Sequence, residues 1–379
     1  MTDTLILLPN SIYVNFIVER LERLFPGKSK YLVLDEGFSN KNYITHPAII
    51  KYFYNGRNKN LNPDLSSYKR VIVHLHDQNT AHFITNYNKS FPGATYIWVL
   101  WGADLYYLPD FVKYIGTHFT QPYINRRLPN SLVIQGKQFI RMLLGWSNSY
   151  SYKKSYQLFD AIATVAQGDY EKAFNYFNKN YRLIQYSHLS ISQMFDEENR
   201  ISAPAGNSIL LGNSGDPANN HDVILDQLAS IEIRRTVVCP LSYGDPEYIQ
   251  VISAYGSQKL GTYFHPITSF MPPKEYYAML QGCSIAIFNH KIQQAYGNII
   301  GLLWNGTKVF LNEENTIFQN LKEWGLHIFS IRTDLNKEEI NNELSTEEII
   351  HNRTILANMF SDEAVDNYYR SLMNFNQVV

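Results

Sequence analysis

Apolar runs and amphipathic stretches alternate along the first half of the chain. Val14–Leu24 has apolar residues at helical spacing, and further helices are expected at 136–145 and from Asp169 onward. Five short apolar runs are typical of buried strands: Leu5–Leu8, Tyr31–Leu34, Arg70–Leu75, Tyr96–Leu100 and Ala161–Val165. This alternation predicts a parallel sheet with helices on both of its faces.

The second half repeats the rhythm after a stretch, 194–207, that is first charged and then rich in Pro, Gly and Ala. Strands are expected at Ser208–Leu211, Thr236–Cys239, Gly261–Phe264, Ser284–Phe288 and Lys308–Leu311, and helices at 221–231, 246–255, 273–281 and 298–304. A chain of 379 residues is long for one hydrophobic core. We therefore predict two α/β domains, 1–193 and 208–355, joined by a linker at 194–207 and followed by a helical tail at 356–379.

Composition narrows the class of protein. With 33 basic and 34 acidic residues the net charge is −1, so no basic field indicates a nucleic acid partner. Cys239 and Cys283 lie in apolar, strand-like contexts without metal-ligand spacing, which indicates two buried thiols in a cytoplasmic protein. The N-terminus lacks a signal-peptide pattern, and no apolar run reaches the ~20 residues that span a bilayer. We expect the protein to meet a membrane, if at all, from one side.

In the first half, polar residues follow the apolar runs Arg70–Leu75 and Tyr96–Leu100. Parallel sheets bind ligands at the carboxyl ends of their strands. Asp104 could deprotonate an acceptor hydroxyl, hold a sugar hydroxyl or cap the following segment. Strand alternation places His74 and His76 on one face of the sheet. His76, nearer the strand end, is the better candidate for polar chemistry, and a structural role for a strand-end histidine is the alternative.

The turn Gly212–Asp216 follows the strand expected at Ser208–Leu211 and leads to a helix near His221. The backbone N–H groups of such a turn, with the positive end of the helix dipole, suit a diphosphate. The alternative is a tight strand–helix turn in which Asn and Asp act as caps. The turn matches neither a P-loop nor a dinucleotide fingerprint.

Further polar loops follow the next two strands of the second half. Lys291 could neutralise a phosphate, and Gly297 lies where a helix opens, which is a second possible anion site. Amide side chains that could read sugar or base edges are Gln293, Gln294 and Asn298. The segment Asn312–Asn315 supplies a carboxylate that could bind ribose or donor-sugar hydroxyls, or could cap a helix. A solvated loop is the alternative for the Lys291 segment.

A basic and aromatic segment lies in the first half. It contains six cations and no acidic residue: Arg126, Arg127, Lys137, Arg141, Lys153 and Lys154. Aromatic side chains are interleaved with these cations. The pattern suits an anionic membrane surface or a lipid diphosphate, and a solvated helix face is the alternative.

Several strings, in order, resemble glycosyltransferase family 56. They are Trp98–Tyr106, Leu211–Asp216 with Asn219–His221, and single matches at His76, Gln78, Gly168, Asp169, Val238, Pro240, Glu247–Ile249, Gln293, Gln294, Gly297, Glu314 and Asn315. The order and spacing hold from about residue 70 to 320. The first 70 residues match poorly, and the loop at Lys291 lacks the arginine expected before the paired glutamines.

The resemblance implies the α/β fold called GT-B, in which two Rossmann-like domains with parallel sheets face a central cleft. It also implies that the C-terminal domain binds the nucleotide sugar and that a C-terminal helix can cross back to the N-terminal domain. By position, the donor-binding residues would be Gly212, Asn213, Ser214, Gly215, Asp216, Lys291, Gln293, Gln294, Gly297, Asn298, Glu314 and Asn315. Gln78, Trp101, Gly102 and Tyr106 would face the acceptor, with Asp104 or His76 as catalytic base. No metal or other cofactor is expected.

The activity implied is the transfer of a deoxysugar, Fuc4NAc-like or fucose-like, from a nucleoside diphosphate. TDP is the favoured nucleotide, and the acceptor would be an undecaprenyl-diphosphate-linked or other cell-surface glycan. The enzyme would be cytoplasmic and peripheral to the inner membrane, touching it through Arg126, Arg127, Lys137 and Arg141. Two alternatives are a nucleotide-sugar epimerase of the same shape, which needs two carboxylates beside the sugar, and a non-catalytic nucleotide-sugar-binding module.

Overall fold

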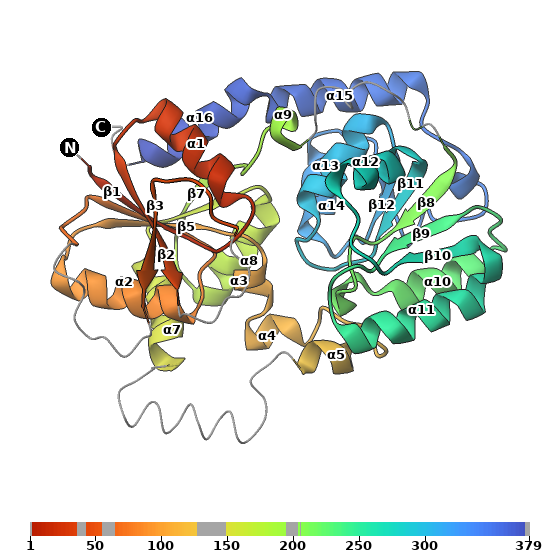
Figure 1. The fold of residues 1–379 in the computed structure, drawn as a ribbon, viewed down its shortest axis with the longest axis horizontal. Coiled ribbons are helices and arrows are strands. Elements are labelled where there is room, and N and C mark those ends of the chain that lie inside the picture. The colour runs from red at the N-terminus through yellow and green to blue at the C-terminus, as the bar shows by residue number, and fades with distance from the viewer. Residues whose placement is uncertain are drawn as a thin grey trace. The chain divides into compact units, whose positions relative to one another are not determined.

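The computed structural model describes residues 2–35, 43–54, 65–126, 149–194, 204 and 206–375. Contacts divide the chain into two compact units, each built on one parallel sheet (Figure 1). The first unit comprises Met1–Leu105, Pro129–Ser190 and Asp362–Val379, and the second comprises Tyr106–Leu128 and Ile191–Ser361. The helix expected at 136–145 and most of the expected linker, 195–203 and 205, lie outside the described residues.

The sheet of the first unit has seven described strands in the order β3-β2-β1-β4-β5-β6-β7, and each pair of neighbours is parallel. The strands are β1 Thr4–Leu8, β2 Ser29–Asp35, β3 Ile49–Phe53, β4 Arg70–His74, β5 Thr95–Val99, β6 Ala161–Thr164 and β7 Arg182–Gln185. Every residue of β1 and β4 is buried, as expected for central strands covered on both faces.

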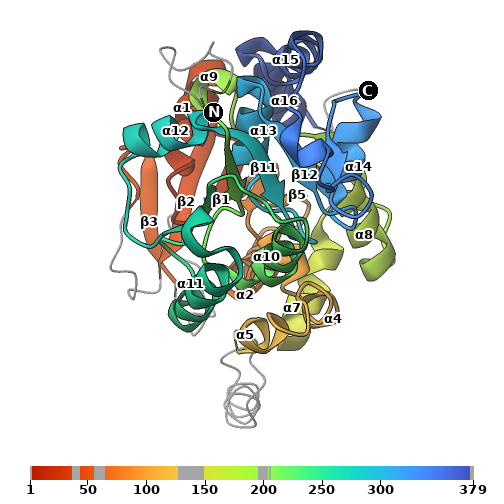
Figure 2. The same cartoon turned by 90° about the vertical axis from the view of Figure 1, so that its right-hand side faces the viewer.

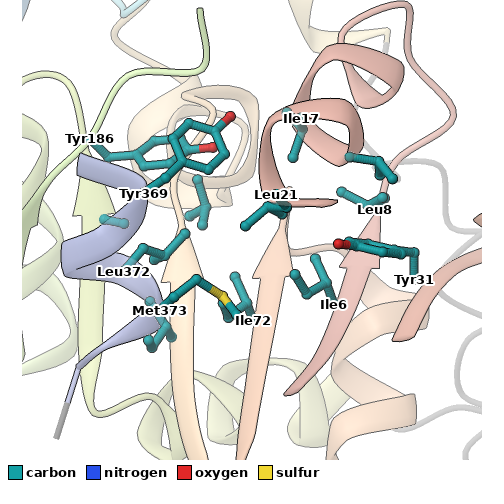
Figure 3. Close-up of a cluster of buried hydrophobic side chains, with 14 of the residues drawn as sticks. Ile6, Leu8, Ile17, Leu21, Tyr31, Ile72, Tyr186, Tyr369, Leu372 and Met373 are labelled. Carbon is teal, nitrogen blue, oxygen red and sulfur yellow. The ribbon is translucent and has the colours of Figure 1, made fainter. Parts of the chain in front are cut away.

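Helices α1 (Val14–Leu24) and α16 (Asp362–Met373) cover one face of this sheet, and α2 (Gln78–Ser90) covers the other (Figure 1). The other helical elements described in the unit are α3 Ala103–Tyr106, whose last residue groups with the second unit, α7 Ser149–Ser155, η1 Tyr156–Leu158 and α8 Gln167–Phe177. The side chains of Leu372 and Met373 pack toward the strands that carry Ile6 and Ile72 (Figure 3). Each such buried side chain stabilises the fold by roughly 1.5–3 kcal/mol.

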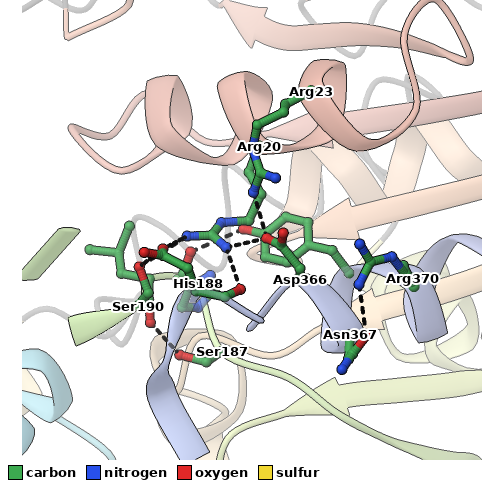
Figure 4. A network of polar contacts seen from close by, with 11 residues as sticks. Arg20, Arg23, Ser187, His188, Ser190, Asp366, Asn367 and Arg370 are labelled. Atoms are coloured by element: carbon green, nitrogen blue, oxygen red, sulfur yellow. Dashed lines mark hydrogen bonds and ion pairs between the residues drawn. The ribbon is translucent and has the colours of Figure 1, made fainter. Parts of the chain in front are cut away.

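A polar network fixes α16 to α1, although the two helices are more than 330 residues apart in the sequence. Arg20 of α1 binds Asp362 and Ser190 through Nη2, at 3.0 Å each, and binds Asp366 through Nη1 (Figure 4). Arg23, one turn later, also contacts Asp366, at 2.6 Å. The C-terminal helix therefore belongs to the first unit, as the resemblance implied.

The second sheet repeats the strand order of the first, β10-β9-β8-β11-β12-β13, again with parallel neighbours. The strands are β8 Ser208–Leu211, β9 Val237–Pro240, β10 Phe264–Ile267, β11 Cys283–Phe288, β12 Lys308–Leu311 and β13 Phe329–Ser330. The core includes side chains of β8, β9, β11 and β12 packed against α10 (His221–Ser230) and α11 (Pro246–Leu260).

Helices α12 (Pro273–Gln281) and α13 (Tyr296–Asn305) lie on the face of this sheet opposite α10 and α11 (Figures 1 and 2). The unit's remaining elements are α4 Pro109–Val112, α5 Gln121–Asn125, α9 Ile191–Met194, η3 Pro217–Asn219, η4 Gly261–Tyr263, α14 Thr316–Glu323, η5 Glu339–Asn341 and α15 Thr346–Phe360.

The two predicted parallel sheets are confirmed, and one predicted strand is misplaced. Gly261 ends α11 with a φ of +56°, and Gly261–Tyr263 forms a 3₁₀ turn, so the strand expected at Gly261–Phe264 begins only at Phe264. Cys239 and Cys283 are buried free thiols, as expected.

Candidate functional site

The strand order reverses between β1 and β4 in the first sheet and between β8 and β11 in the second. Open α/β sheets bind ligands outside the carboxyl ends of their strands at such reversals. The turn Gly212–Asp216 and the Lys291 loop follow the two strands at the second reversal, and His76 follows β4 at the first. Each unit therefore carries predicted site residues where its topology favours a ligand.

Asp104 lies in a cage of N–H groups inside the first unit. Its Oδ2 accepts hydrogen bonds from Trp98 Nε1 at 2.6 Å and from the His76 backbone at 3.1 Å, and its Oδ1 accepts one from the Trp101 backbone at 3.0 Å. Burial raises the pKa of Asp104 to about 6, although the three hydrogen bonds favour the ionised form. The carboxylate thus joins the end of β5 to the loop after β4.

Both ring nitrogens of His76 bond to groups of the same unit. Ser155 Oγ donates to the Tyr152 carbonyl at 2.6 Å, so it accepts from His76 Nε2–H at 2.8 Å. Nδ1 then accepts from Thr80 Oγ1 at 3.0 Å. Burial lowers the pKa of His76 to about 3. The side chain is a neutral imidazole that links α2 to α7.

The expectation that His74 and His76 share a face is wrong. β4 ends at His74, and Leu75 has a φ of +60°, a left-handed conformation that breaks the alternation of the strand. The His76 ring packs against Trp98 on one side of the sheet, whereas the His74 ring faces Tyr186 in the layer of α1 and α16.

The residues predicted to face the acceptor have different local surroundings in the structure. Gln78 is the exposed first residue of α2, and Gly102, with a φ of +93°, forms the turn before α3. The Trp101 ring lies 4.5 Å from the His188 ring. Tyr106 belongs to the second unit, where its hydroxyl contacts Thr316 Oγ1 at 3.2 Å.

The turn Gly212–Asp216 is held rigidly in the second unit. Gly215 forms a parallel bridge with Gly244, with Gly215 N donating to Tyr243 O at 2.7 Å and Asp245 N to Gly215 O at 3.0 Å. Asp216 accepts from Ala218 N at 2.9 Å and so caps a 3₁₀ turn. The capping alternative for Asp216 is thus realised, and the turn presents its backbone in a fixed conformation.

Inside this turn, Asn219 ties the loop together and His221 lies beneath it. The Asn219 amide donates to Asp216 O at 3.1 Å, and its Oδ1 accepts from Asn213 N at 3.2 Å. Gly212 has a φ of +68°, and a Cβ at that position would lie 2.4 Å from His221 Nε2. A glycine is therefore required at 212 both by backbone conformation and by the histidine below it.

His290 and His221 are buried histidines to which the sequence analysis assigned no role in the site. Asn315 Nδ2 donates to His290 Nδ1 at 2.8 Å, which leaves the ring proton on Nε2. Neither His290 Nε2 nor His221 Nε2 has a hydrogen-bond partner among the described residues. Burial lowers the pKa of His290 to about 4 and that of His221 to about 3. The signal in the sequence was their position: His290 follows the end of β11, and His221 is the first residue of α10.

The side chain of Asn315 is hydrogen-bonded to groups of the second unit. Its amide also donates to the carbonyls of His290 and Ile292, at 3.1 and 2.9 Å, and its Oδ1 accepts from Ile317 N at 2.9 Å. It caps α14 and holds the loop after β11, so it positions His290. The residue of the segment Asn312–Asn315 that caps the helix is thus an amide, Asn315, and not a carboxylate.

The paired glutamines lie just before α13. Oε1 of Gln293 and Oε1 of Gln294 are buried without a partner in the described part of the chain. Ala295, with a φ of +57°, is the N-cap residue of α13, and a Cβ added to Gly297 would meet nothing within 4 Å. Asn298 donates to the Tyr276 hydroxyl at 3.3 Å. The first turn of α13 therefore has open space beside its N–H groups.

Lys291 and Glu314, both predicted to bind the donor, form an ion pair with Nζ and Oε1 3.1 Å apart. The Glu314 side chain is 64% exposed, so the contact is open to solvent and weak. The neighbouring Glu313 instead binds Ser330 and the backbone of Arg332. Lys291 thus supplies a cation that a stronger anion could recruit.

Of the cations expected to touch a membrane, Arg126 pairs with Glu247 and lies 5.0 Å from the centre of the Tyr123 ring. Arg127, Lys137 and Arg141 lie outside the described residues. Among the helices that the structure describes, none combines the length and the apolar character needed to cross a bilayer. The described residues contain no group of three or more His, Cys, Asp or Glu arranged to hold a metal ion.

Two units with the Rossmann strand order, 3-2-1-4-5-6 in the second sheet and the same order with a seventh strand added in the first, define the GT-B class of fold. Sucrose-phosphate synthase of Thermosynechococcus elongatus is similar over 98% of this chain and 99% of its own, with a TM-score of 0.62 and 10% identity. HepE of Anabaena, in complex with UDP and glucose, gives a TM-score of 0.61 at 10% identity, covering 98% and 99%. A glycosyltransferase of Rickettsia africae gives 0.58 at 11% identity, covering 98% of both chains.

The family model described as 4-alpha-L-fucosyltransferase, glycosyl transferase group 56, matches residues 146–376, more than half of the chain. The protein belongs to this family of glycosyltransferases. The matched range contains the whole second sheet and α16, whereas His76 and Asp104 precede it.

Proposed function

We propose that this glycosyltransferase transfers a deoxysugar, Fuc4NAc-like or fucose-like, from a nucleoside diphosphate, with TDP favoured, to a lipid-linked or other cell-surface glycan. The proposed donor site rests on one observation: around the β8–β11 reversal, a group of buried polar atoms has no hydrogen-bond partner in the part of the chain that the structure describes. These atoms are His221 Nε2, His290 Nε2, Gln293 Oε1 and Gln294 Oε1.

Buried polar atoms without partners destabilise a fold, by about 1–3 kcal/mol each. A nucleotide sugar offers both donors and acceptors, so it can satisfy amide and imidazole groups together. His290, as the neutral Nε2–H tautomer, would donate to a phosphate or sugar oxygen. The glutamine amides would bond to hydroxyls of the sugar or to edges of the base.

The diphosphate would bind at the first turn of α13, where Gly297 leaves room and backbone N–H groups are unpaired in a free helix. Lys291 would turn from Glu314 to the phosphates as negative charge develops on the leaving group. We propose that these groups stabilise the leaving diphosphate without a metal ion. Asp104 and His76, whose polar atoms are bonded within the first unit, would position the loops at its sheet edge.

Thermal unfolding with a panel of nucleotides tests this proposal. A ligand that binds only the folded state raises stability by RT ln(1 + [L]/Kd), roughly 2.7 kcal/mol at a hundredfold excess over Kd. We expect TDP and its sugars to raise Tm more than UDP, GDP or ADP do. A stronger response to UDP or GDP would make that nucleotide, and not TDP, the proposed donor nucleotide. No response to any nucleotide would overturn the proposed donor site.

Lys291→Met separates the contribution of the phosphates to nucleotide affinity from the contribution of the nucleoside. The variant should lose about tenfold in affinity for the diphosphate and keep its affinity for the nucleoside. Lys259→Met is the matched control, because Lys259 is also an ion-paired lysine of the second unit, bound to Asp226 of α10. Equal losses in both variants would argue against a phosphate contact at Lys291.

The acceptor class is proposed on the family, and the membrane contact is proposed on the family together with the basic and aromatic segment that contains Arg126. An anionic surface would compete with Glu247 for Arg126. Sedimentation with anionic vesicles checks this: neutralising Arg126, Arg127, Lys137 and Arg141 together should release the protein. Unchanged sedimentation of that variant would place the membrane contact elsewhere.

A further inference from the structure

A second group of buried polar atoms lies in the first unit, at the carboxyl ends of β4 and β5. His74 is 1% exposed, and neither its Nδ1 nor its Nε2 has a partner among the described residues. In the same part of the structure, Nδ1 of His188 and Nε1 of Trp101 are buried and have no hydrogen-bond partner within the described ranges. The hydrogen bonds of Asp104 and His76 described above do not involve these atoms.

The three residues form one cluster with aromatic walls. The centre of the His74 ring lies 6.3 Å from that of Trp101 and 6.1 Å from that of His188. The His188 and Trp101 rings are 4.5 Å apart. The ring centre of Tyr186 lies 6.0 Å from that of His74, and the ring centre of the partly exposed Tyr13 lies 6.1 Å from that of Trp101. The cluster thus combines flat apolar faces with hydrogen-bonding atoms.

Both imidazoles are uncharged at neutral pH. Burial lowers the pKa of His74 well below its usual value, with a further contribution from His188, and burial lowers the pKa of His188 to about 3. A neutral imidazole offers one N–H donor and one lone pair, and the indole of Trp101 offers a donor only. A partner must therefore both donate and accept, as a hydroxyl does.

We propose that the cluster of His74, Trp101 and His188 binds an uncharged pyranose ring of the acceptor glycan. Sugar hydroxyls would satisfy the four unpaired atoms, and the C–H face of the ring would lie against the aromatic side chains. Uncharged groups of this kind favour a neutral ring over a phosphate. This assignment rests on the proposed function, since it places the acceptor in the first unit while the donor is proposed to bind in the second.

His74→Phe tests the proposal directly. The substitution keeps an aromatic ring and removes two buried nitrogens without partners, so Tm of the free protein should rise by about 2–4 °C. Sugar binding should fall at least tenfold. His82→Phe is the control, because His82 is a half-buried histidine of the same unit that bonds to Tyr54. That variant should lose stability and keep sugar binding.

Methyl β-N-acetylglucosaminide and methyl α-mannoside serve as probes at millimolar concentration, with inorganic phosphate as the charged comparison. Binding is measured as the rise in Tm and as a change in indole fluorescence. We expect either sugar to act on the wild type and to lose its effect in His74→Phe and in Trp101→Phe. If His74→Phe does not fold, His188→Gln takes its place.

A sugar response that His74→Phe, Trp101→Phe and His188→Gln all retain would overturn the proposal, as would a response to phosphate alone or to none of the probes. Nucleotide binding is measured on the same samples. If no nucleotide stabilises the wild type but the sugars still bind through His74, the proposed sugar site stands and the donor site fails.

Discussion

Trp98 Nε1 donates a hydrogen bond to Asp104 Oδ2 at 2.6 Å, inside the first unit. Because Trp98 is in β5 and Asp104 is in α3, this bond fixes the turn between them, and the same oxygen accepts from the backbone of His76 after β4. The carboxylate therefore joins two neighbouring strand ends. Its chemistry is that of an acceptor for three N–H donors.

Asp104→Asn should lower the free energy of unfolding by about 1–3 kcal/mol at pH 8, because the new amide must point N–H groups at a buried N–H donor. Urea denaturation measures the loss. Asp77→Asn is the control: Asp77 caps α2 at an exposed position, and Asn is as good a cap as Asp. Equal stabilities of wild type and Asp104→Asn would contradict the N–H cage.

The same pair of proteins tests the raised pKa of Asp104. Its folded pKa, about 6, lies above the unfolded value of 3.8, so protonation favours the folded state as pH falls through 6. The contribution of this group to stability is therefore larger at pH 5 than at pH 8, by about 1 kcal/mol. The difference between wild type and Asp104→Asn should widen by that amount. Parallel stability curves from pH 8 to 5 would argue against a raised pKa.

Arg20→Met should destabilise the first unit by about 3 kcal/mol, because it leaves the carboxylates of Asp362 and Asp366 without their buried partner. Arg23→Met is the matched control. The Arg23 side chain is 56% exposed although it binds the same Asp366, so its loss should cost less than about 1 kcal/mol. Urea denaturation of both variants measures the ratio, and similar losses would mean that burial does not set the strength of these pairs.

The sequence predicted the parts of this fold that local pattern determines. Apolar runs marked the central strands, and the periodicity of Val14–Leu24 gave the limits of α1. The edge strands β7 and β13 were missed because they are short or polar: β13 has two residues, and β7 begins with two exposed ones. The edge strand β3 was missed although four of its five residues are apolar. Side-chain networks were beyond reach, since Asn315 and His290 are 25 residues apart and meet only in the folded chain. The left-handed Leu75, which separates His74 from His76, carried no sequence signal.

Asn220 should prove essential for holding the segment of α4 and α5 to the second sheet. Its Nδ2 donates to Ile115 O at 3.0 Å and its Oδ1 accepts from Thr120 Oγ1 at 2.6 Å, both in that segment. We expect Asn220→Ala to cost about 3 kcal/mol and to expose residues 106–126 to limited proteolysis. Asn220 has a φ of +50°, so Asn220→Gly should be about 1 kcal/mol more stable than Asn220→Ala, because glycine removes the backbone strain. Residues 106–126 should nevertheless remain open to proteolysis in Asn220→Gly. Protection of the segment in both variants would refute this role.

Two glycines of the second unit should respond oppositely to alanine. Gly244 has a φ of +137°, and a Cβ there would lie 2.2 Å from the backbone carbon of Gly215, so Gly244→Ala must separate the two loops. The loss should exceed about 3 kcal/mol, because backbone cannot yield as a side chain does. At Gly297 a Cβ would meet open space, and alanine favours a helix by up to about 1 kcal/mol. Gly297→Ala should therefore be as stable as the wild type or more so.

Nucleotide binding then decides whether the space beside Gly297 is used. If the diphosphate approaches the first turn of α13, the added methyl group of Gly297→Ala should weaken nucleoside diphosphate binding at least tenfold, by titration calorimetry, in a protein of undiminished stability. The nucleoside alone should bind both proteins equally, because only the phosphates reach the helix. Undiminished diphosphate affinity in Gly297→Ala would move the phosphate site away from α13 and leave the turn at Gly212 as the anchor.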